Sequence, residues 1–360
     1  MALPPIAGVS DAVGALLDTA RELESSIRLP MDLDAVEGRR FLLRMLSASV
    51  DTFVEYDDVE RPSFHHAEGP HRKMFADNPD TTYLRAPIRL GPGRSYRLWG
   101  RIPPGTLYCG ILLYGKGGRI GNRLLDTDLD CDADGNFELR ISTEKQPSVW
   151  LQGDGDETAV LVRQYFADRS KEAPVEVQIE LDGEPAAPQP LDAAALEGQI
   201  GKAQRMLESV FRRTIDAYRM GSGMALNRFL EVPGDQLFPT PDNRYHVCWY
   251  RFGYNQLMFV RGKLPKARYF SLSLCNAWME SFDYEHHTVS LNHAQIDADG
   301  NDNFEVCLAH RDPKHPNWLD TTGHHAGYLI VRELLAEGEP PQFEIQVMYE
   351  SEWEKKHDGE

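Results

Sequence analysis

The 360-residue sequence lacks the features of secreted and membrane-spanning proteins. No apolar run approaches the roughly 20 residues of a membrane span, and no charged N-terminal region precedes a long apolar stretch. The cysteines are odd in number and form no Cys-x-x-Cys pair, which favours reduced, buried thiols. They are Cys109, Cys131, Cys248, Cys275 and Cys307. We therefore expect a cytoplasmic protein with no signal peptide and no membrane partner.

Several functional classes also lack their motifs. The formal net charge is −18 and no dense Lys/Arg run occurs, so nucleic acid is not an expected partner. The sequence contains no Gly-x-Ser-x-Gly elbow, no P-loop and no strand-coupled Gly-x-Gly-x-x-Gly. Serine hydrolysis, phosphoryl transfer and a nucleotide cofactor therefore have no motif support.

What is present is the composition of a strand-rich globular protein. Hydrophobic residues make up 41% and charged residues 26%, close to globular averages, and 29 Gly with 23 Pro indicate many turns. A chain of 360 residues exceeds the size at which one core usually keeps growing. We expect two domains.

Five short motifs occur twice, in the same order. The spacing between partners grows slightly along the chain, as loop insertions would produce. The paired segments are 79–83 with 241–245, 100–103 with 262–265, 132–136 with 297–301, 150–151 with 318–319, and 162–163 with 331–332. We interpret them as an internal duplication, with domains at 1–190 and 191–360.

Each half begins with helix and continues with strands. Apolar residues at three- and four-residue spacing predict helices over 10–27, 34–55 and 192–220, the last with Asp192 as its N-cap. Segments 57–79 and 220–241 are interpreted as long irregular connections. Period-two patterns predict strands at 82–89, 95–101, 107–114, 136–142, 158–166, 175–181, 245–251, 256–262, 268–275, 304–309, 326–333 and 341–349. The predicted fold class is α+β, mainly β, with two tandem antiparallel β-sandwich, jelly-roll-like halves, each preceded by amphipathic helix.

Two phrases carry a family resemblance. Asn78-Pro79-Asp80-Thr81-Thr82-Tyr83, with the later Gly-Arg-x-Pro, Asp-Gly-x-Phe, Trp-Leu and Val-Arg-Gln-Tyr, resembles the bacterial domains of unknown function numbered 1254 and 1214. The stretch from Pro265 to Leu272 is similar to the Pro-x-x-Arg-Tyr-x-Ser-Leu signature of the same family. The resemblance implies a β-sandwich and no transferable catalytic set. The second half has Thr240-Pro241-Asp242-Asn243 where the first half has the full phrase.

The first phrase supplies ligand-binding candidates. Asp80 could orient a small polar substrate, with Tyr83 and Arg85 on one strand face; alternatively, the Asp80 carboxylate forms a local Asx-turn. The full set of ligand-binding candidates is Asn78, Asp80, Thr81, Tyr83, Arg85, Asp242, Tyr245, His246 and Arg251.

Two groups of residues could bind a divalent metal. Aspartates at every second position from Asp126 to Asp134 would share one side of an extended backbone and could bind Ca²⁺, unless Asp-Gly simply forms a turn. The histidine-rich second half offers His286, His287 and His293 as metal candidates, or as exposed loop histidines.

The leading hypothesis is a small-molecule-binding protein or enzyme. Its cleft would lie between the two β repeats, closed by the 57–79 and 220–241 loops, with general acid–base chemistry if it is catalytic. A hydrophobic or saccharide-like ligand is favoured over an anionic one because of the negative net charge. The alternative is a non-catalytic interaction or assembly module that forms a homo-oligomer. The sequence assigns no catalytic residues.

Overall fold

The computed structural model describes residues 9–232 and 240–357, which form two compact units. In the described ranges, the first unit contains 9–72, 81–166 and 171–213. The second contains 73–80, 167–170, 214–232 and 240–357. Two short segments of the N-terminal half therefore belong to the second unit, and each unit is described by itself.

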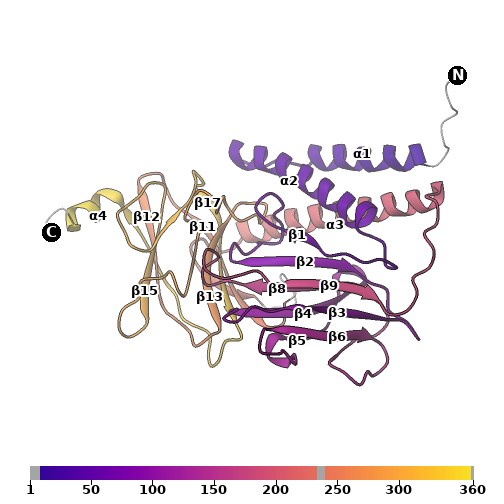
Figure 1. The fold of residues 1–360 in the computed structure, drawn as a ribbon. Helices are drawn as coiled ribbons and strands as arrows, with labels where there is room; N and C mark the ends of the chain where they lie inside the picture. Colours follow the sequence, from indigo (N-terminus) through magenta and orange to yellow (C-terminus); the bar gives the residue numbers. More distant parts are fainter. Residues whose placement is uncertain (1–8, 233–239, 358–360) are drawn as a thin grey trace. The chain divides into compact units, whose positions relative to one another are not determined.

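The first unit contains two β-sheets (Figure 1). The five-stranded sheet has the order β1-β2-β8-β4-β5, and the four-stranded sheet has the order β7-β6-β3-β9. Neighbouring strands are antiparallel except for β6 and β7, which are parallel. The strands are β1 (His65–Glu68), β2 (Thr81–Pro87), β3 (Ser95–Arg101), β4 (Tyr108–Gly115), β5 (Ile120–Leu125), β6 (Asn136–Ser142), β7 (Trp150–Gln152), β8 (Glu157–Tyr165) and β9 (Glu176–Leu181).

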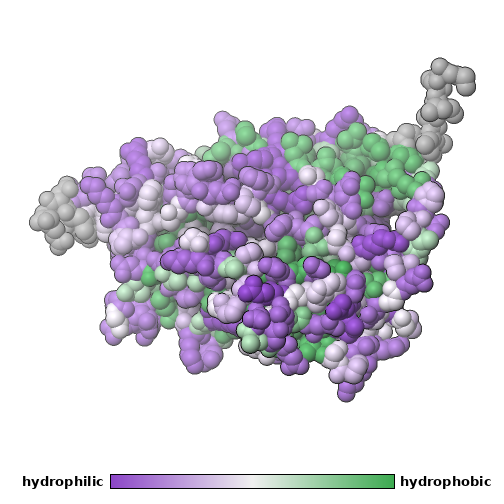
Figure 2. Space-filling view, in the orientation of Figure 1, coloured by the Kyte–Doolittle hydropathy of each residue, from purple (hydrophilic) through white to green (hydrophobic). Residues whose placement is uncertain are grey.

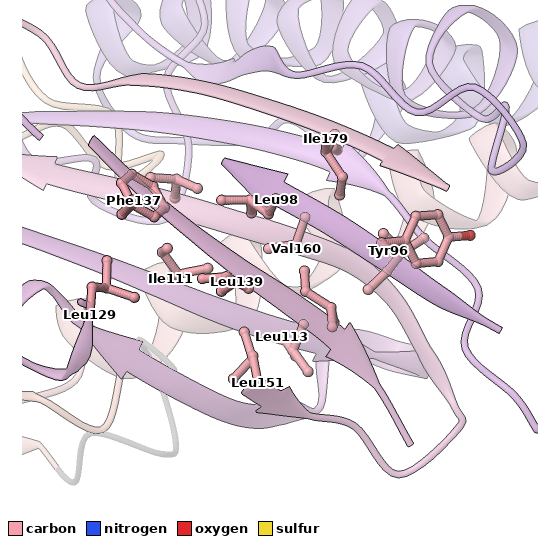
Figure 3. Close-up of a cluster of buried hydrophobic side chains, with 14 of the residues drawn as sticks. Tyr96, Leu98, Ile111, Leu113, Leu129, Phe137, Leu139, Leu151, Val160 and Ile179 are labelled. Atoms are coloured by element: carbon pink, nitrogen blue, oxygen red, sulfur yellow. The ribbon is translucent and has the colours of Figure 1, made fainter. Parts of the chain in front are cut away.

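The core of the first unit lies between these two sheets. Alternate residues of each strand point inward, for example Ile111 and Leu113 on β4 and Leu139 on β6 (Figure 3). Tyr96 and Phe137 fill the same layer and are buried. Burial of one face of each sheet defines a β-sandwich.

Helices cover the first unit on one side (Figure 1). They are α1 (Val9–Ser25), α2 (Asp32–Val50), which continues into a short π-helical turn, η1 (Asp51–Glu55), and the N-terminal part of α3 (Ala193–Ser222). Asp192 caps α3 by accepting a hydrogen bond from the Ala195 backbone N–H at 2.7 Å, as predicted. Two further short helices are η2 (Lys116–Gly118) and η3 (Asp126–Asp128).

The second unit repeats this architecture. Its sheets have the orders β10-β11-β17-β13-β14 and β16-β15-β12-β18, with β15 and β16 as the parallel pair. The strands are β10 (Phe229–Val232), β11 (Asn243–Arg251), β12 (Gln256–Lys263), β13 (Tyr269–Cys275), β14 (Ser290–Asn292), β15 (Asn303–Ala309), β16 (Trp318–Asp320), β17 (Ala326–Leu334) and β18 (Glu344–Tyr349). The C-terminal helix α4 (Glu350–His357) contributes Trp353 to a small cluster on the outer side of the four-stranded sheet.

Equivalent residues make equivalent contacts in the two units, which confirms the duplication. Tyr83 pairs with Arg163 across β2 and β8, and Tyr245 pairs with Arg332 across β11 and β17. The two sheet orders also match strand for strand when nine is added to each strand number of the first unit. The predicted fold class, two tandem antiparallel sandwiches with preceding helix, is therefore confirmed.

One predicted alignment was wrong. The motif 132–136 was matched to 297–301, but the structural equivalent of Asp132 is Asp299. Asp132 accepts hydrogen bonds from the Asn136 backbone and amide, and Asp299 accepts the same pair from Asn303. The shared Asp-Ala-Asp-Gly-Asn letters therefore lie two residues out of register in the second unit.

The prediction of two long irregular connections was also only partly right. Segment 57–79 contains β1 and segment 220–241 contains β10, each pairing antiparallel with its neighbour in the same sheet. Residues 233–239 of the second connection lie outside the described residues. β1, His-His-Ala-Glu, is a polar strand that is held by backbone hydrogen bonds to β2, and such pairing leaves little trace in the side-chain pattern.

Within the described residues, no helix is long and apolar enough to cross a membrane. All five cysteines are free thiols, and only Cys131 is exposed.

Candidate functional site

A cavity of about 650 Å³ lies in the first unit. It is lined by one face of helix α2, by Asp51 and Tyr56, and by most of segment 65–72. That volume is in the range of small-molecule sites, which are usually concave and partly preformed. All of the lining residues precede position 73, so the whole cavity lies within one unit.

Helix α2 forms its wall through a regular helical stripe. The lining residues Arg40, Leu43, Arg44 and Ser47 are spaced by three, one and three positions, which places them on one face of the helix. Leu43 is 66% exposed. The opposite face is anchored in the unit by Phe41 and other buried residues. The same helix therefore contributes both to the core and to the cavity.

His65 is the most unusual residue of the cavity. It is only 7% exposed, yet neither ring nitrogen has a hydrogen-bond partner among the described residues. Its ring stacks on Tyr56, with centroids 4.2 Å apart and an interplanar angle of 18°. Buried polar nitrogens are normally satisfied, so an unpartnered imidazole at a cavity wall indicates a position for a water or a ligand atom.

The surroundings of His65 are positively charged. Arg85 lies opposite His65 in the β1–β2 register, and its Nη1 lacks a hydrogen-bond partner within the described part of the chain. Arg72 forms an ion pair with Asp51 and donates to the His66 carbonyl at 3.3 Å. Burial, together with the charges of Arg85 and Arg72, lowers the pKa of His65 from 6.5 to about 4. The imidazole is therefore neutral at pH 7.

This shift predicts a pH dependence of stability. Between pH 6.5 and about 4 the unfolded chain takes up a proton at His65 that the folded chain does not, so stability falls as the pH falls. At pH 5 the loss is up to about 2 kcal/mol, and above pH 6.5 this contribution is fully present. Urea unfolding at pH 7 and pH 5 should show a smaller pH effect in His65→Phe than in the wild type. The exposed neighbour provides the control, because His66→Phe should retain the wild-type pH effect; equal pH effects in all three proteins would contradict the assignment.

The other first-unit candidates lie on β2, next to this cavity in the sheet. Thr81 is buried, and Tyr83 and Arg85 are two residues apart and share a face of the strand. Arg85 lies in register with His65 and Tyr83 with Glu68, and both His65 and Glu68 line the cavity. Burial lowers the pKa of Arg85 to about 10, which leaves the guanidinium charged at neutral pH.

Asn78 and Asp80 lie in the second unit and support structure there. The Tyr269 hydroxyl donates to Asp80 at 2.8 Å and to Asn78 at 3.1 Å, and the Asn292 amide donates to Asp80 at 2.9 Å. The turn itself is formed by the Asn78 side chain, which accepts the Asp80 N–H at 3.2 Å. The Asx-turn interpretation was therefore wrong for the Asp80 carboxylate, whose partners are distant in sequence.

The second-unit candidates on β11 form a buried polar group. His246 and Glu333 are both buried, with 2.6 Å between Nε2 and Oε1, and Arg244 donates to the other oxygen of Glu333 at 2.7 Å. Both carboxylate oxygens of Glu333 are therefore engaged by these two side chains. Tyr245 is hydrogen-bonded to the Thr240 hydroxyl.

The remaining two candidates of this set are separate from that group. Asp242 is buried and accepts from the Asn243 amide at 3.4 Å, and its carbonyl accepts the Leu335 N–H at 2.8 Å. Arg251 is exposed at the end of β11.

The predicted histidine metal candidates point to different partners. His286 contacts Asp283 at 2.9 Å, and His287 contacts Asp320 at 2.8 Å. His293 lies edge-on to the Tyr269 ring. In the described ranges, no set of three close metal-ligating side chains includes any of these histidines.

The aspartate row does not form either. Residues 126–128 are a short 3-10 helix, so the backbone is not extended there and the carboxylates do not share a side. Asp128 accepts the Leu125 N–H at 2.9 Å, while Asp132 accepts the N–H groups of Asp134 and Asn136. The calcium interpretation of this row was wrong, and its alternative, turn formation, describes these residues.

Neither His65, His66 and His71 nor the arginines of the cavity were singled out as site residues in the sequence analysis. The signal available was the i, i+4 spacing of Arg40 and Arg44 on the exposed side of a predicted helix. It became meaningful only when β1 brought the histidines to the same cavity.

The architecture and cavity define a tandem β-sandwich protein with N-terminal helices. A solved structure of an uncharacterised protein from Burkholderia cenocepacia is similar, with 26% sequence identity, a TM-score of 0.87, and coverage of 96% of this chain and 97% of that one. The VPA0106 protein from Vibrio parahaemolyticus shares the fold at 11% identity and a TM-score of 0.52, covering 92% of this chain and 100% of that one. No family model matches the chain, and no curated protein matches it.

Proposed function

We propose that this chain is a small-molecule-binding protein or enzyme, and that its ligand occupies the cavity of the first unit. The observation that carries the proposal is His65, which is buried at the cavity wall and has no hydrogen-bond partner for either ring nitrogen among residues 9–232 and 240–357. A ligand atom that hydrogen-bonds there would remove the cost of a buried unsatisfied polar group, about 1–3 kcal/mol. Native structures rarely leave such a group unused.

The walls support a saccharide-like or partly hydrophobic ligand. Tyr56 and Leu43 offer an aromatic ring and an exposed aliphatic side chain, while Ser47 and the arginines offer polar contacts. If the protein is catalytic, His65 is the cavity residue suited to general acid–base chemistry, because it is neutral at pH 7.

Filling the cavity tests this proposal. Ser47→Trp places a large side chain on the cavity face of α2, and Val36→Trp places the same side chain at a position of α2 that is 63% exposed and does not line the cavity. A set of neutral, apolar and anionic compounds is screened by thermal shift against the wild type and both variants. We expect any compound that stabilises the wild type to lose its effect in Ser47→Trp and keep it in Val36→Trp.

Two results would contradict the cavity assignment. One is that no compound of any class shifts the melting temperature. The other is that binding compounds act equally on all three proteins, which would place them elsewhere.

A second candidate function is a homo-oligomeric assembly module. Helices α1 and α2 expose large apolar side chains, and Figure 2 shows a hydrophobic surface over these helices. The residues are Val13 and Leu17 on α1, Met31 directly before α2, and Leu33, Val36 and Leu43 on α2. Sedimentation velocity separates the candidates, because only the assembly module requires self-association.

Two further assignments belong with this proposal. The free cysteines support a reducing, cytoplasmic location. Kinship with the bacterial domains of unknown function numbered 1254 and 1214 is supported by a contact between the two signature phrases, since Tyr269 donates to both Asn78 and Asp80.

A further inference from the structure

The cavity is richer in positive charge than the chain around it. The whole sequence carries a formal net charge of −18, yet three arginines line the cavity against two carboxylates. Asp51 pairs with Arg72, and Arg40 pairs with Glu37, which does not line the cavity, at 2.9 Å. Arginines that gather in one place in an acidic protein favour an anion there, because charges of one sign that line a cleft focus the field.

The chemistry of these side chains selects a particular kind of anion. Arg40 and Arg44 lie on successive turns of α2 and both line the cavity, and a guanidinium offers a fork of N–H donors that matches two oxygens of a carboxylate or a phosphate. His65 adds a neutral imidazole, which has one N–H to donate. Arg85, in register with His65 on the adjacent strand, adds a further positive charge beside the imidazole.

We propose that this wall of the cavity binds an anionic group of the ligand, a carboxylate or a phosphate, with His65 donating a ring N–H to it. The inference rests on the proposed function, because it names the ligand class of the same cavity. A sugar acid or sugar phosphate combines this group with the saccharide-like body that Tyr56 and Leu43 can contact. The ligand class therefore differs from the neutral one that the net charge of the whole chain suggests.

Three matched sugars test the inference. Isothermal titration calorimetry of the full chain at constant ionic strength compares glucuronate, glucose 6-phosphate and neutral glucose. We expect at least one of the charged sugars to bind at least about tenfold more tightly than glucose. A hydrogen bond to a charged group provides a gain in affinity of this size. The stronger of the two charged sugars identifies carboxylate or phosphate as the preferred group.

Three variants identify the binding groups. His65→Phe keeps a ring that can stack on Tyr56 but removes the donor, and Arg44→Gln removes a charge from the exposed face of α2. Each should weaken binding of the preferred charged sugar about tenfold, without a matching loss for glucose. Arg39→Gln makes the same charge change on the same helix outside the cavity lining and should weaken binding less than twofold. Since Arg44 lies on the helix surface, its variant remains informative if His65→Phe does not fold.

The outcomes separate this inference from the proposed function. Equal binding of all three sugars, tighter binding of glucose, or binding that Arg44→Gln and Arg39→Gln weaken equally would overturn the inference. If none of the three sugars bound at a concentration of about 10 mM, the inference would also be overturned. The proposed function would fail only if, in addition, the cavity-filling screen found no compound that Ser47→Trp displaces.

Discussion

Asp77→Ala is expected to lower the free energy of unfolding of the second unit by about 3–5 kcal/mol. The Asp77 carboxylate is buried and accepts hydrogen bonds from the Ser281 backbone N–H at 2.9 Å and hydroxyl at 2.7 Å. Burial raises the pKa of Asp77, and the charges of Lys73 and Arg332 act in the opposite direction. Removing the carboxylate leaves those two buried cations with less compensation and the Ser281 N–H without its acceptor.

The two cations that face Asp77 have fixed positions. Lys73 Nζ donates to the carbonyls of Ser281 at 2.9 Å and Phe282 at 2.6 Å. Arg332 donates to the Ala76 carbonyl, and the Ala76 N–H donates to the Met279 carbonyl at 2.7 Å. Segment 73–80 is therefore held to the second unit by a charged network.

Chemical denaturation measures the effect of Asp77→Ala, with two comparison variants. Asp77→Asn keeps an acceptor oxygen and should be intermediate. Asp216→Ala removes an exposed carboxylate of the same unit that pairs with Arg219, and it should change stability little. Equal loss in Asp77→Ala and Asp216→Ala would show that the buried network does not stabilise the unit.

Phe41→Ala is the second substitution with a large expected effect, about 3–5 kcal/mol. Phe41 is fully buried on the core face of α2, and its ring centroid lies 5.9 Å from that of Phe211 on α3. Because Arg40 and Arg44 project from the same helix into the cavity, loss of this anchor should also weaken ligand binding.

A matched substitution on α2 separates stability from binding. Leu43→Ala removes an exposed cavity-lining side chain, so it should change ligand affinity while leaving the unfolding transition nearly unchanged. Thermal unfolding with and without ligand measures both quantities. A smaller stability loss for Phe41→Ala than for Leu43→Ala would contradict the assignment of the two faces of α2.

Periodicity in the sequence was sufficient to locate the main elements. The strand predicted at 95–101 matches β3, and the helix predicted at 192–220 matches α3 within two residues. Such elements bury one face continuously, so their side chains alternate or repeat at helical spacing. β1 was missed because His-His-Ala-Glu has no apolar alternation and is ordered by pairing with β2.

Letter matches located the repeat but misplaced one turn. The structure needs a left-handed residue just before β6 and β15, which is Gly135 with φ 86° in one unit and Asp302 with φ 66° in the other. Asp tolerates that conformation, so the second copy can do without glycine there. The sequence alignment nevertheless matched Gly135 with Gly300, which is the wrong position.

The polar partners of the signature phrase lay beyond sequence reasoning. Asp80 accepts hydrogen bonds from Tyr269 and Asn292, which are distant along the chain and lie on the paired strands β13 and β14. His65 was similarly unremarkable as one of twelve histidines. Its lack of a partner is a property of the folded cavity wall and has no local signal.

The most direct test of the cavity assignment is the ring ¹⁵N spectrum of the histidines during ligand titration. His65→Phe and His246→Phe spectra assign two of the buried imidazoles, one at the cavity wall and one paired with Glu333. We predict that the compound displaced by Ser47→Trp shifts the His65 ring signals at saturation and leaves those of His246 unchanged. Unchanged His65 signals in the saturated protein would contradict the proposal that the ligand occupies this cavity.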